Sequence, residues 1–299
     1  MRNFIKLMIL AILLFSSLID CGNDKGVDSS DNNNTENQSI PIEETVLYEG
    51  NGVRVTTNEI VLMGESKYTA RLVLNIENNS GESFHIKEWM VAVNGYMMRE
   101  YLLNTNPATR VEANEINKEA DVYLEASALH LVDIPIKKIE TIDISLQVKH
   151  GDYGVTIKTD SVQIKTSRSS VFKTIHDDSG YELYNKDGIR IIVKQLNGLD
   201  YHEFIGIDGI YIYIENLSGI DINITTLIDG IESDYEARTL VMNNTRNIVS
   251  INLHEEMNKD LKALFNIYNA RTEEEIHSTS KIIIDKSKVK IKLREWVGV

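Results

Sequence analysis

Short runs of alternating apolar and polar residues make up most of the chain after about residue 44. Such alternation places every second side chain on one face, which is typical of a strand with one buried face. Residues 71–76 alternate and stop at the turn cluster Asn78–Gly81, and residues 90–93 run into Asn94-Gly95, a strong hairpin signal because both residues accept positive φ. Further expected strands cover residues 139–148, 155–165, 189–193, 209–214, 220–225, 248–253, 264–268 and 281–285, with helical turns near 126–132 and 255–264. This spacing predicts an all-β fold of antiparallel sandwiches.

The pattern occurs twice along the chain. Three motifs return in the same order at a nearly constant offset, which indicates duplication of one domain. They are Leu47-Tyr48 with Gly52–Val55 against Leu183-Tyr184 with Gly188–Ile191, then Ile76–Gly81 against Ile214–Gly219, and Val93–Gly95 against Ile228–Gly230. We therefore expect two tandem antiparallel β-sandwiches, at 44–167 and 168–299, the second with an extra C-terminal strand. The second copy is shorter around residues 255–264, so the loops there should differ most.

Charge and cysteine content exclude several functions. The formal net charge is −14, whereas a nucleic-acid-binding protein needs a basic surface to offset phosphate charge. The single cysteine, Cys21, allows neither an internal disulfide nor a cysteine-based zinc site. None of the seven histidines lies two, three or four residues from another, and residues 254–258 begin like a zinc-protease helix but place Asn258 where the second ligand belongs. No metal or cofactor is expected.

Catalytic motifs are also missing from the sequence. It contains no nucleophile elbow, no phosphate-binding P-loop and no dinucleotide-binding glycine pattern. His176-Asp177-Asp178, with Asp187 nearby, gathers acidic oxygens that could suit calcium, although the EF-hand spacing is absent and an exposed linker has the same composition. The chain is therefore not expected to be an enzyme.

The first 43 residues have the composition of an export and anchoring segment. Arg2 and Lys6 precede the apolar run 7–15, which is short for a membrane-spanning helix but suits a signal-peptide core. After Cys21 the chain is polar and rich in Asn, Asp and Ser. Residues 21–43 are therefore expected to form a flexible tether with a reach on the order of 25 Å.

This order of segments resembles the signal peptides of bacterial lipoproteins. Leu18 occupies the position that the family fills with leucine, whereas Ile19 and Asp20 replace its small residues. The resemblance implies removal of residues 1–20, attachment of a diacylglycerol to Cys21 and fatty acylation, for example with palmitate. Two acyl chains hold a protein on a bilayer stably, whereas one does not. An uncleaved membrane anchor and a buried structural cysteine are the alternatives.

The repeated motifs resemble those of immunoglobulin-like domains that occur in tandem on lipoproteins of Gram-positive bacteria. The resemblance covers roughly residues 44–166 and 176–286. Its motifs are structural, so it implies the fold and a surface location but no active site.

Two segments are candidate contact sites. Tyr96, Met97 and Met98 follow the Asn-Gly turn and would meet a partner at an exposed loop tip, or else continue into the core. Near the C-terminus the chain alternates so that one face carries the cations Lys288, Lys290, Lys292 and Arg294. This segment could be an edge strand protected by its charges, or a basic strip that touches anionic cell-wall polymer or lipid.

Taken together, these features predict a non-enzymatic lipoprotein on the outer face of the cytoplasmic membrane, acting as a binding or spacer module of the cell envelope. Its partners would be the bilayer, through acylated Cys21, and an envelope protein or polymer. The alternatives are an accessory subunit that presents a ligand to a membrane complex, and an envelope hydrolase. A binding module should show an exposed apolar patch or a groove between domains, a hydrolase a pocket with paired histidines or carboxylates, and a spacer neither.

The lipid anchor is tested by replacing Cys21 with Ala. Without the thiol no lipid can be attached, so we expect release of the protein from the membrane or accumulation of an unprocessed precursor. Membrane fractionation and intact-mass measurement distinguish these products. A mature-sized protein that stays on the membrane would contradict the anchor.

Overall fold

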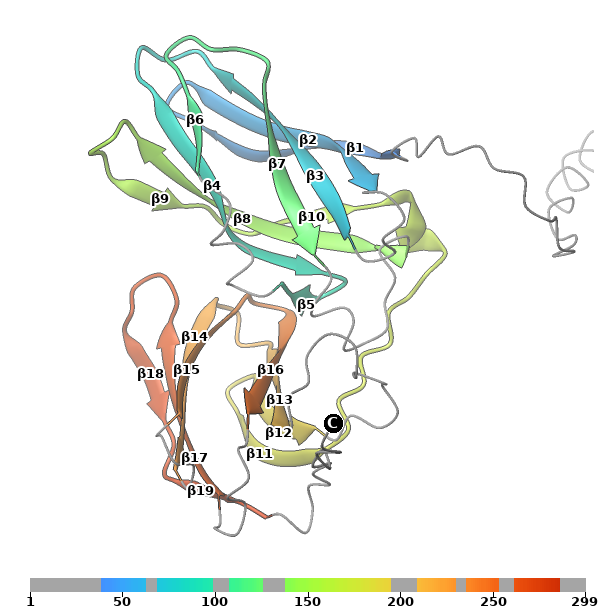
Figure 1. Ribbon diagram of the computed structural model, residues 1–299, viewed down its shortest axis with the longest axis vertical. Helices are drawn as coiled ribbons and strands as arrows, with labels where there is room; N and C mark the ends of the chain where they lie inside the picture. Colours follow the sequence, from blue (N-terminus) through green and yellow to red (C-terminus); the bar gives the residue numbers. More distant parts are fainter. Residues whose placement is uncertain are drawn as a thin grey trace, which may run out of the picture. The chain divides into compact units, whose positions relative to one another are not determined.

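The computed structural model describes residues 39–62, 69–98, 108–125, 138–194, 209–229, 235–252 and 261–285, all within one compact unit, Glu36–Val299. The described secondary structure consists of β-strands in antiparallel sheets with one short 3-10 turn, so the all-β prediction is confirmed (Figure 1). The expected signal peptide 1–20, Cys21, the helical turn at 126–132 and the basic segment 288–294 lie outside the described residues.

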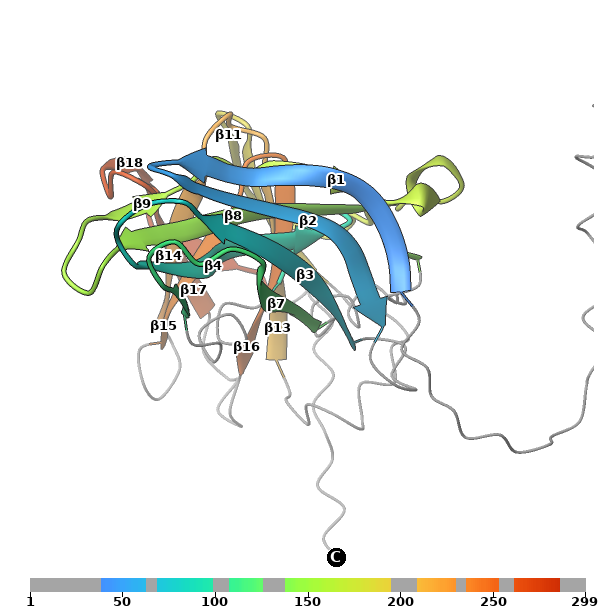
Figure 2. The same cartoon turned by 90° about the horizontal axis from the view of Figure 1, so that it is seen from above.

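The first repeat is a sandwich of two antiparallel layers (Figure 2). One layer has the order β1-β2-β3-β7, and in the other β4 pairs with β6 and β8 while β8 pairs with β9 and β10. The first layer comprises β1 (Ser39–Gly50), β2 (Val53–Leu62), β3 (Thr69–Asn78) and β7 (Lys118–Glu125). The second comprises β4 (Phe84–Val93), β5 (Tyr96–Met97), β6 (Thr109–Val111), β8 (Thr141–His150), β9 (Thr156–Lys158) and β10 (Val162–Lys165).

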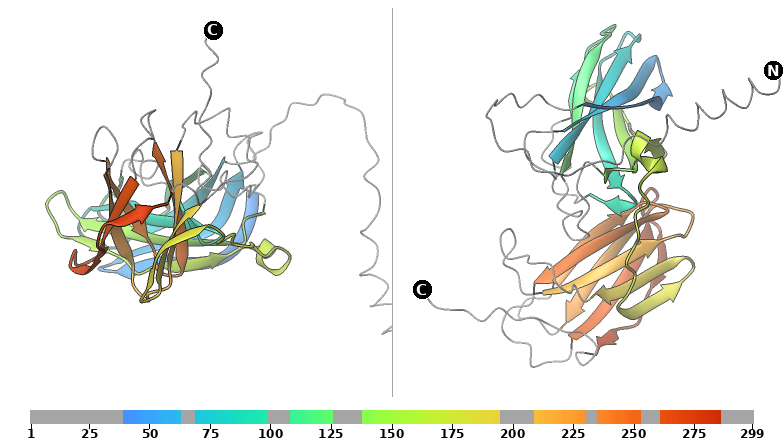
Figure 3. Two further views of the ribbon diagram at one scale, coloured as in Figure 1. Left: turned by 90° about the horizontal axis from the view of Figure 1, so that it is seen from below. Right: turned by 90° about the vertical axis from the view of Figure 1, so that its right-hand side faces the viewer.

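The second repeat follows the 3-10 turn Ser167–Ser170 and has the same connectivity (Figure 3). One layer has the order β11-β12-β13-β16, and in the other β14 pairs with β15 and β17 while β17 pairs with β18 and β19. The strands are β11 (Tyr181–Lys186), β12 (Ile189–Lys194), β13 (Gly209–Asn216), β14 (Ile222–Asp229), β15 (Tyr235–Val241), β16 (Thr245–Asn252), β17 (Leu261–Asn269), β18 (Glu275–Ser278) and β19 (Ile282–Ile284). Crossing between layers at β3–β4 and β13–β14 is typical of immunoglobulin-like sandwiches.

Two sequence boundaries need correction. β1 begins at Ser39, inside the expected tether 21–43. It starts this early because Ser39 already pairs with Val61 of β2. A helical turn was expected at 255–264. The structure describes the last four of these residues, and they form the start of the strand β17, which begins at Leu261, so the prediction is wrong there.

A buried asparagine explains why the same Asn-x-Ser motif occurs in both copies. Asn78 has an exposed fraction of 0%. Its Nδ2 donates to the carbonyls of Glu82 and Glu112, both at 2.7 Å, and its Oδ1 accepts from the Ser80 backbone N–H at 2.9 Å and the Ser80 hydroxyl at 2.7 Å. One buried side chain thus satisfies polar groups from two segments of the chain, the turn 80–82 and Glu112.

Asn216 makes the same set of bonds in the second copy. It too is 0% exposed. Its Nδ2 donates to the carbonyls of Ile220 at 2.8 Å and Val241 at 2.9 Å, while its Oδ1 accepts from the Ser218 backbone N–H at 3.1 Å and the Ser218 hydroxyl at 2.7 Å. The duplication therefore extends to individual hydrogen bonds.

The β4–β5 hairpin joins the two repeats into one sheet. Asn94 and Gly95 both have positive φ, 51° and 75°, which confirms the predicted tight turn. The Gly95 carbonyl accepts a hydrogen bond from the Arg246 backbone N–H at 2.8 Å, and Tyr96 pairs with Arg246 in a parallel bridge between β5 and β16. A continuous ten-stranded sheet therefore crosses from one repeat to the other.

The two hydrophobic cores each take side chains from both repeats. Trp89, Met90, Ala92 and Met97 of the first repeat pack in the core of the second. In return, the core of the first repeat includes Ile192, Tyr213 and Ile248. The apolar run before and after Asn94 is thus buried on both faces, which is why it does not alternate.

We predict that the buried asparagines are worth far more to stability than exposed ones. Asn78→Ala or Asn216→Ala removes four hydrogen bonds made by a fully buried side chain, so each should lower the free energy of unfolding by about 2–3 kcal/mol. Urea denaturation followed by circular dichroism measures this. Asn185→Ala is the control, because Asn185 is exposed and its side chain donates to the exposed Glu182 carboxylate at 3.3 Å. Equal effects at buried and exposed positions would contradict the structural role.

Candidate ligand-binding site

A pocket of about 560 Å³ lies on the face of the β14-β15-β17 sheet that points away from the core. Along β14 the side chains of Ile222, Ile224 and Ile228 belong to the core, so the alternate residues Asn223, Thr225 and Leu227 lie on the opposite face. The pocket is lined by Asn223, Thr225, Leu227, Arg238, Leu240, Asn266, Tyr268, Asn269, Ala270 and Glu273 of the second repeat, and by Trp89 and Lys158 of the first. Both repeats are therefore needed to form it.

A β-bulge places Trp89 at the pocket. The register of β4 against β8 shifts between Glu88 and Met90, so Trp89 is an extra residue on β4. Bulges re-aim side chains in this way. The corresponding register of β14 against β17 is unbroken, and Leu227 pairs with Leu264 as Met90 pairs with Ser145. Trp89 therefore has no equivalent in the second repeat.

Lys158 is held against Trp89 at the same wall. Its Nζ lies 4.5 Å from the centroid of the Trp89 ring and donates to the Ala270 carbonyl at 3.3 Å. A cation over an indole face contributes about 0.5–2 kcal/mol, more as the pair is desolvated. Trp89 is nearly buried, so the ammonium is fixed in position by two contacts with different chemistry.

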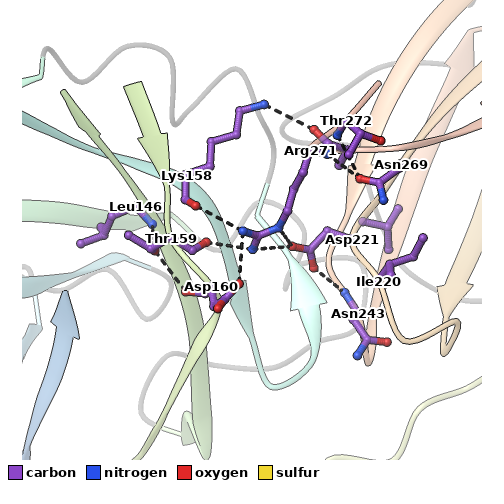
Figure 4. A network of polar contacts seen from close by, with 12 residues as sticks. Leu146, Lys158, Thr159, Asp160, Ile220, Asp221, Asn243, Asn269, Arg271 and Thr272 are labelled. Carbon is purple, nitrogen blue, oxygen red and sulfur yellow. Dashed lines mark hydrogen bonds and ion pairs between the residues drawn. The ribbon is translucent and has the colours of Figure 1, made fainter. Parts of the chain in front are cut away.

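Arg271 is the polar clamp between the repeats (Figure 4). Its Nη2 lies 3.1 Å from Asp221 Oδ2 and donates to the Thr159 carbonyl at 2.9 Å. Its Nη1 donates to the Lys158 carbonyl at 3.2 Å and lies 3.2 Å from Asp160 Oδ1. Asp221 is only 8% exposed, so this ion pair compensates a carboxylate that is largely removed from water.

The β17–β18 turn that carries Arg271 is organised by Asn269. The Asn269 Oδ1 accepts from the backbone N–H groups of Arg271 at 2.8 Å and Thr272 at 3.1 Å. Glu273 follows with φ of 61°, which is uncommon for a residue other than Gly, Asn or Asp. The turn therefore sets both the clamp and one rim of the pocket.

One residue of the lining has a buried polar atom without a partner. The Oδ1 of Asn223 is buried and has no hydrogen bond. Asn266, by contrast, accepts a hydrogen bond from the Ser278 hydroxyl at 2.6 Å. A buried acceptor left unpaired is unfavourable in a folded protein.

The candidate contact residues Tyr96, Met97 and Met98 lie elsewhere and are each 2% exposed. The expectation of an exposed loop tip is therefore corrected, and the alternative, that they continue into the core, describes their environment. Met97 belongs to the core of the second repeat, and Tyr96 and Met98 to that of the first. These residues were expected to contact a partner protein, and in the structure they contact the other repeat of the same chain.

Tyr96 packs against the linker histidine His176. The ring centroids are 5.0 Å apart. Burial, and then the nearby charge of Arg246, lower the pKa of His176 to about 4, and burial raises the pKa of Tyr96. Because the folded-state pKa of His176 lies below its ordinary value of about 6.5, this histidine makes folding less favourable as the pH falls from 6.5 towards 4.

The acidic residues near His176 are already engaged. Asp178 Oδ2 lies 2.6 Å from Arg190 Nη1, which lowers the pKa of this carboxylate, and Asp177 Oδ1 accepts from the Ser179 backbone N–H at 3.0 Å. Asp187 Oδ2 lies 3.6 Å from Lys186 Nζ. Over the described part of the chain, no group of three or more His, Cys, Asp or Glu is placed to hold a metal ion.

Two histidine–carboxylate pairs among the described residues lie outside the pocket, and in the looser one His150 Nδ1 is 3.7 Å from Glu82 Oε2. The Nε2 of His85 lies 3.0 Å from Asp152 Oδ1, and Arg110 Nη1 approaches the same oxygen at 3.5 Å. Asp152 is exposed at the end of the β8–β9 hairpin. Since an arginine shares this carboxylate, the pair reads as a surface ion pair, which contributes little to stability.

Sequence reasoning missed the pocket. Its lining comes from alternate positions on three strands, and none of these positions belongs to a motif. The only hint in the sequence was Trp89, a large aromatic residue at the start of the apolar run 89–93. Lys288, Lys290, Lys292 and Arg294 lie outside the described residues, and among the residues that are described no helix is long and apolar enough to cross a membrane.

No protein-family model matches the chain, and a comparison with curated proteins likewise finds no match.

We predict that Arg271→Ala lowers the free energy of unfolding by about 2–3 kcal/mol, because Asp221 is left largely buried and unpaired. The loss for Arg271→Ala combined with Asp221→Ala should be smaller than the sum of the two single losses, as measured by a double-mutant cycle in urea. Arg54→Ala is the control, since Arg54 and Glu44 are both exposed and 3.4 Å apart; it should cost less than about 1 kcal/mol. Additive single effects at 271 and 221 would disprove the clamp.

Proposed function

We propose that the chain is a lipoprotein held on the outer face of the bacterial cytoplasmic membrane by a lipid on Cys21, and that it acts there as a non-enzymatic binding module of the cell envelope. The leader sequence and the polar segment after Cys21 support the location. The tandem sandwiches support a role outside the cytoplasm, since such modules commonly present binding surfaces.

The pocket is the observation that supports binding rather than a spacer role. A spacer needs a stiff connection between repeats but no concave site. Here an open pocket of about 560 Å³ lies where the repeats meet, and its volume is within the range typical of small-molecule sites. The lining combines polar side chains, such as Asn266 and Lys158, with the aromatic rings of Trp89 and Tyr268.

The lining does not support a hydrolase. A pocket that hydrolyses its ligand needs a nucleophile or an acid–base pair within hydrogen-bonding distance. The residues that line this pocket include one carboxylate, Glu273, and no histidine. The arrangement can hold and orient a ligand, and we infer that the ligand leaves unchanged.

The binding function is tested by filling the pocket. Leu227→Trp adds bulk at a lining position, whereas Val155→Trp places the same side chain at a site that is 81% exposed and outside the lining. The full-length protein in detergent is melted in the presence of fractionated small fragments from a hydrolysed Gram-positive cell envelope. We expect at least one fraction to raise the melting temperature of the wild type and the Val155→Trp control by a few degrees, and Leu227→Trp by much less.

Mass spectrometry of the bound fraction before and after incubation checks that the ligand is unaltered. Stabilisation by no fraction, or equal stabilisation of the pocket-filled variant, would contradict a binding role for this pocket. A ligand recovered as cleaved product would contradict the non-enzymatic part of the proposal.

A further inference from the structure

We propose that residues 165–175, the turn that leads from the first repeat into the second, contact the surface of a bilayer that contains anionic lipid. This segment, the linker turn, would hold the folded part of the chain in one orientation on the membrane. The inference rests on the membrane location proposed for the chain and is independent of the pocket. Four properties of the linker turn lead to it: exposed apolar side chains, a local excess of positive charge, a fixed conformation and a position beside the start of β1.

The linker turn exposes large apolar side chains. Val171 has an exposed fraction of 73% and Ile175 one of 90%. Phe172, next to Val171, is half-buried. Single exposed apolar residues are common on protein surfaces, but several gathered in one short segment commonly mark a contact with a membrane or another protein. The charge of the same segment distinguishes between these partners.

The charge of the linker turn is opposite to that of the whole protein. Lys165, Arg168 and Lys173 are exposed, and the turn contains no Asp or Glu, whereas the formal net charge of the chain is −14. Exposed Lys138 adds a fourth cation, because its Nζ lies 5.8 Å from the centroid of the Phe172 ring. Cations with apolar side chains between them suit a surface of anionic lipid, where the charges meet headgroups and the apolar groups leave water. An apolar groove on another protein would not use the cations.

The acidity of the rest of the chain does not prevent this contact. Carboxylates flank the turn, since Asp177 and Asp178 follow it and Glu43 and Glu44 come early in β1. At about 0.1 M salt, however, charges more than about 10 Å from the bilayer are largely screened. The balance of charge at the contact therefore decides the sign of the interaction, and within the linker turn this balance is positive.

The conformation of the linker turn is fixed at both ends. Thr166 is only 4% exposed, and its Oγ1 donates to the Ile139 carbonyl at 2.5 Å and accepts from the Arg168 backbone N–H at 3.1 Å. Towards the other end the Thr174 hydroxyl donates to Glu140 Oε1 at 2.8 Å. The turn projects beyond the end of β10 (Figure 2). A surface that is already ordered avoids the entropy cost of ordering a loop on binding.

The linker turn lies where the folded part of the chain begins. Ile42 of β1 and Thr166 form an antiparallel bridge, so the start of β1 and the start of the turn are neighbours (Figures 1 and 2). Residues 22–38 separate Ser39, the first residue of β1, from Cys21. A flexible segment of this length has a reach on the order of 25 Å. A lipid on Cys21 would keep the turn close to the same bilayer, so even a weak intrinsic affinity is sufficient for contact.

An environment-sensitive fluorophore on the full-length lipidated protein tests the contact. Val171→Cys carries the label, and Val155→Cys, at a site on the β8–β9 hairpin that is 81% exposed, is the control. The proteins are reconstituted into vesicles of phosphatidylcholine alone or of equal parts of phosphatidylcholine and phosphatidylglycerol. We expect about a twofold rise in emission or more at residue 171 on the anionic vesicles only, and little change at residue 155. Raising the salt from about 0.1 M to about 1 M shortens the Debye length from about 10 Å to about 3 Å and should remove most of the rise.

Two sets of substitutions, each made in the labelled Val171→Cys protein, separate the linker turn from net charge. The first set neutralises the three cations of the turn: Lys165→Gln, Arg168→Gln and Lys173→Gln. The control set removes the same charge from exposed positions elsewhere in the fold: Arg110→Gln, Lys186→Gln and Lys262→Gln. We expect the first set to abolish most of the rise at residue 171 and the control set to preserve it. All six positions are exposed, so the melting temperature should change little in either set.

Each contrary outcome has its own meaning. If emission at residue 171 does not rise above that at residue 155, or if the rise survives in the first set, the contact is wrong, while a protein still held on the vesicle by its lipid leaves the proposed location standing. An equal rise on neutral vesicles would overturn the role of the cations. A rise on intact cells but not on vesicles would show that an envelope protein or polymer covers the turn in place of lipid. If intact mass shows no lipid on Cys21 and the protein leaves the vesicles, both the location and the contact fail.

Discussion

The structure depends on the burial of one hairpin on both of its faces. In an isolated sandwich the outward side chains of β4 would meet water, but here Trp89, Met90 and Ala92 pack in the core of the second repeat. The turn at its end is fixed by Asn94, whose Oδ1 accepts from the Glu140 backbone N–H at 2.7 Å and whose Nδ2 donates to the Lys138 carbonyl at 3.1 Å. Because this apolar surface is covered only when both repeats are folded, their stabilities must be coupled.

The same strand has diverged between the copies, and the divergence creates the pocket. β4 and β14 are equivalent in the duplication, and each turns one face away from its own core. On β4 this outer face is apolar near the end of the strand, and the second repeat covers it. On β14 the same face carries Asn223, Thr225 and Leu227, which lie beside residues of β15 and β17 and line the pocket with them. The extra residue Trp89 then reaches across from the first copy. A bulge and a few polar side chains thus leave a pocket where the first copy has a packing surface.

The sequence predicted the features whose causes are local. The Asn94-Gly95 turn and the duplicated Asn-x-Ser motif could be recognised because turn geometry depends on a few neighbouring residues. The strands β7 and β15 were not predicted, because in KEADVYLE and YEARTLV charged residues interrupt the alternation. Both lie at a sheet edge, where charges are favoured because they prevent pairing with other chains. The pocket, the Arg271 clamp and the burial of Tyr96 result from contacts between residues far apart in the chain, which no local pattern encodes. The lipid anchor at Cys21 and the basic segment 288–294 stay predictions.

Hydrogen exchange in the native protein, read by mass spectrometry, tests the shared interface most directly. If the hairpin is held between the two repeats, backbone amides of residues 89–98 and of β16 should exchange only on global unfolding, with the same protection as the central strands β3 and β13. Exchange of residues 89–98 through a low-energy opening, while β3 and β13 remain fully protected, would show that the repeats separate freely and would contradict the account.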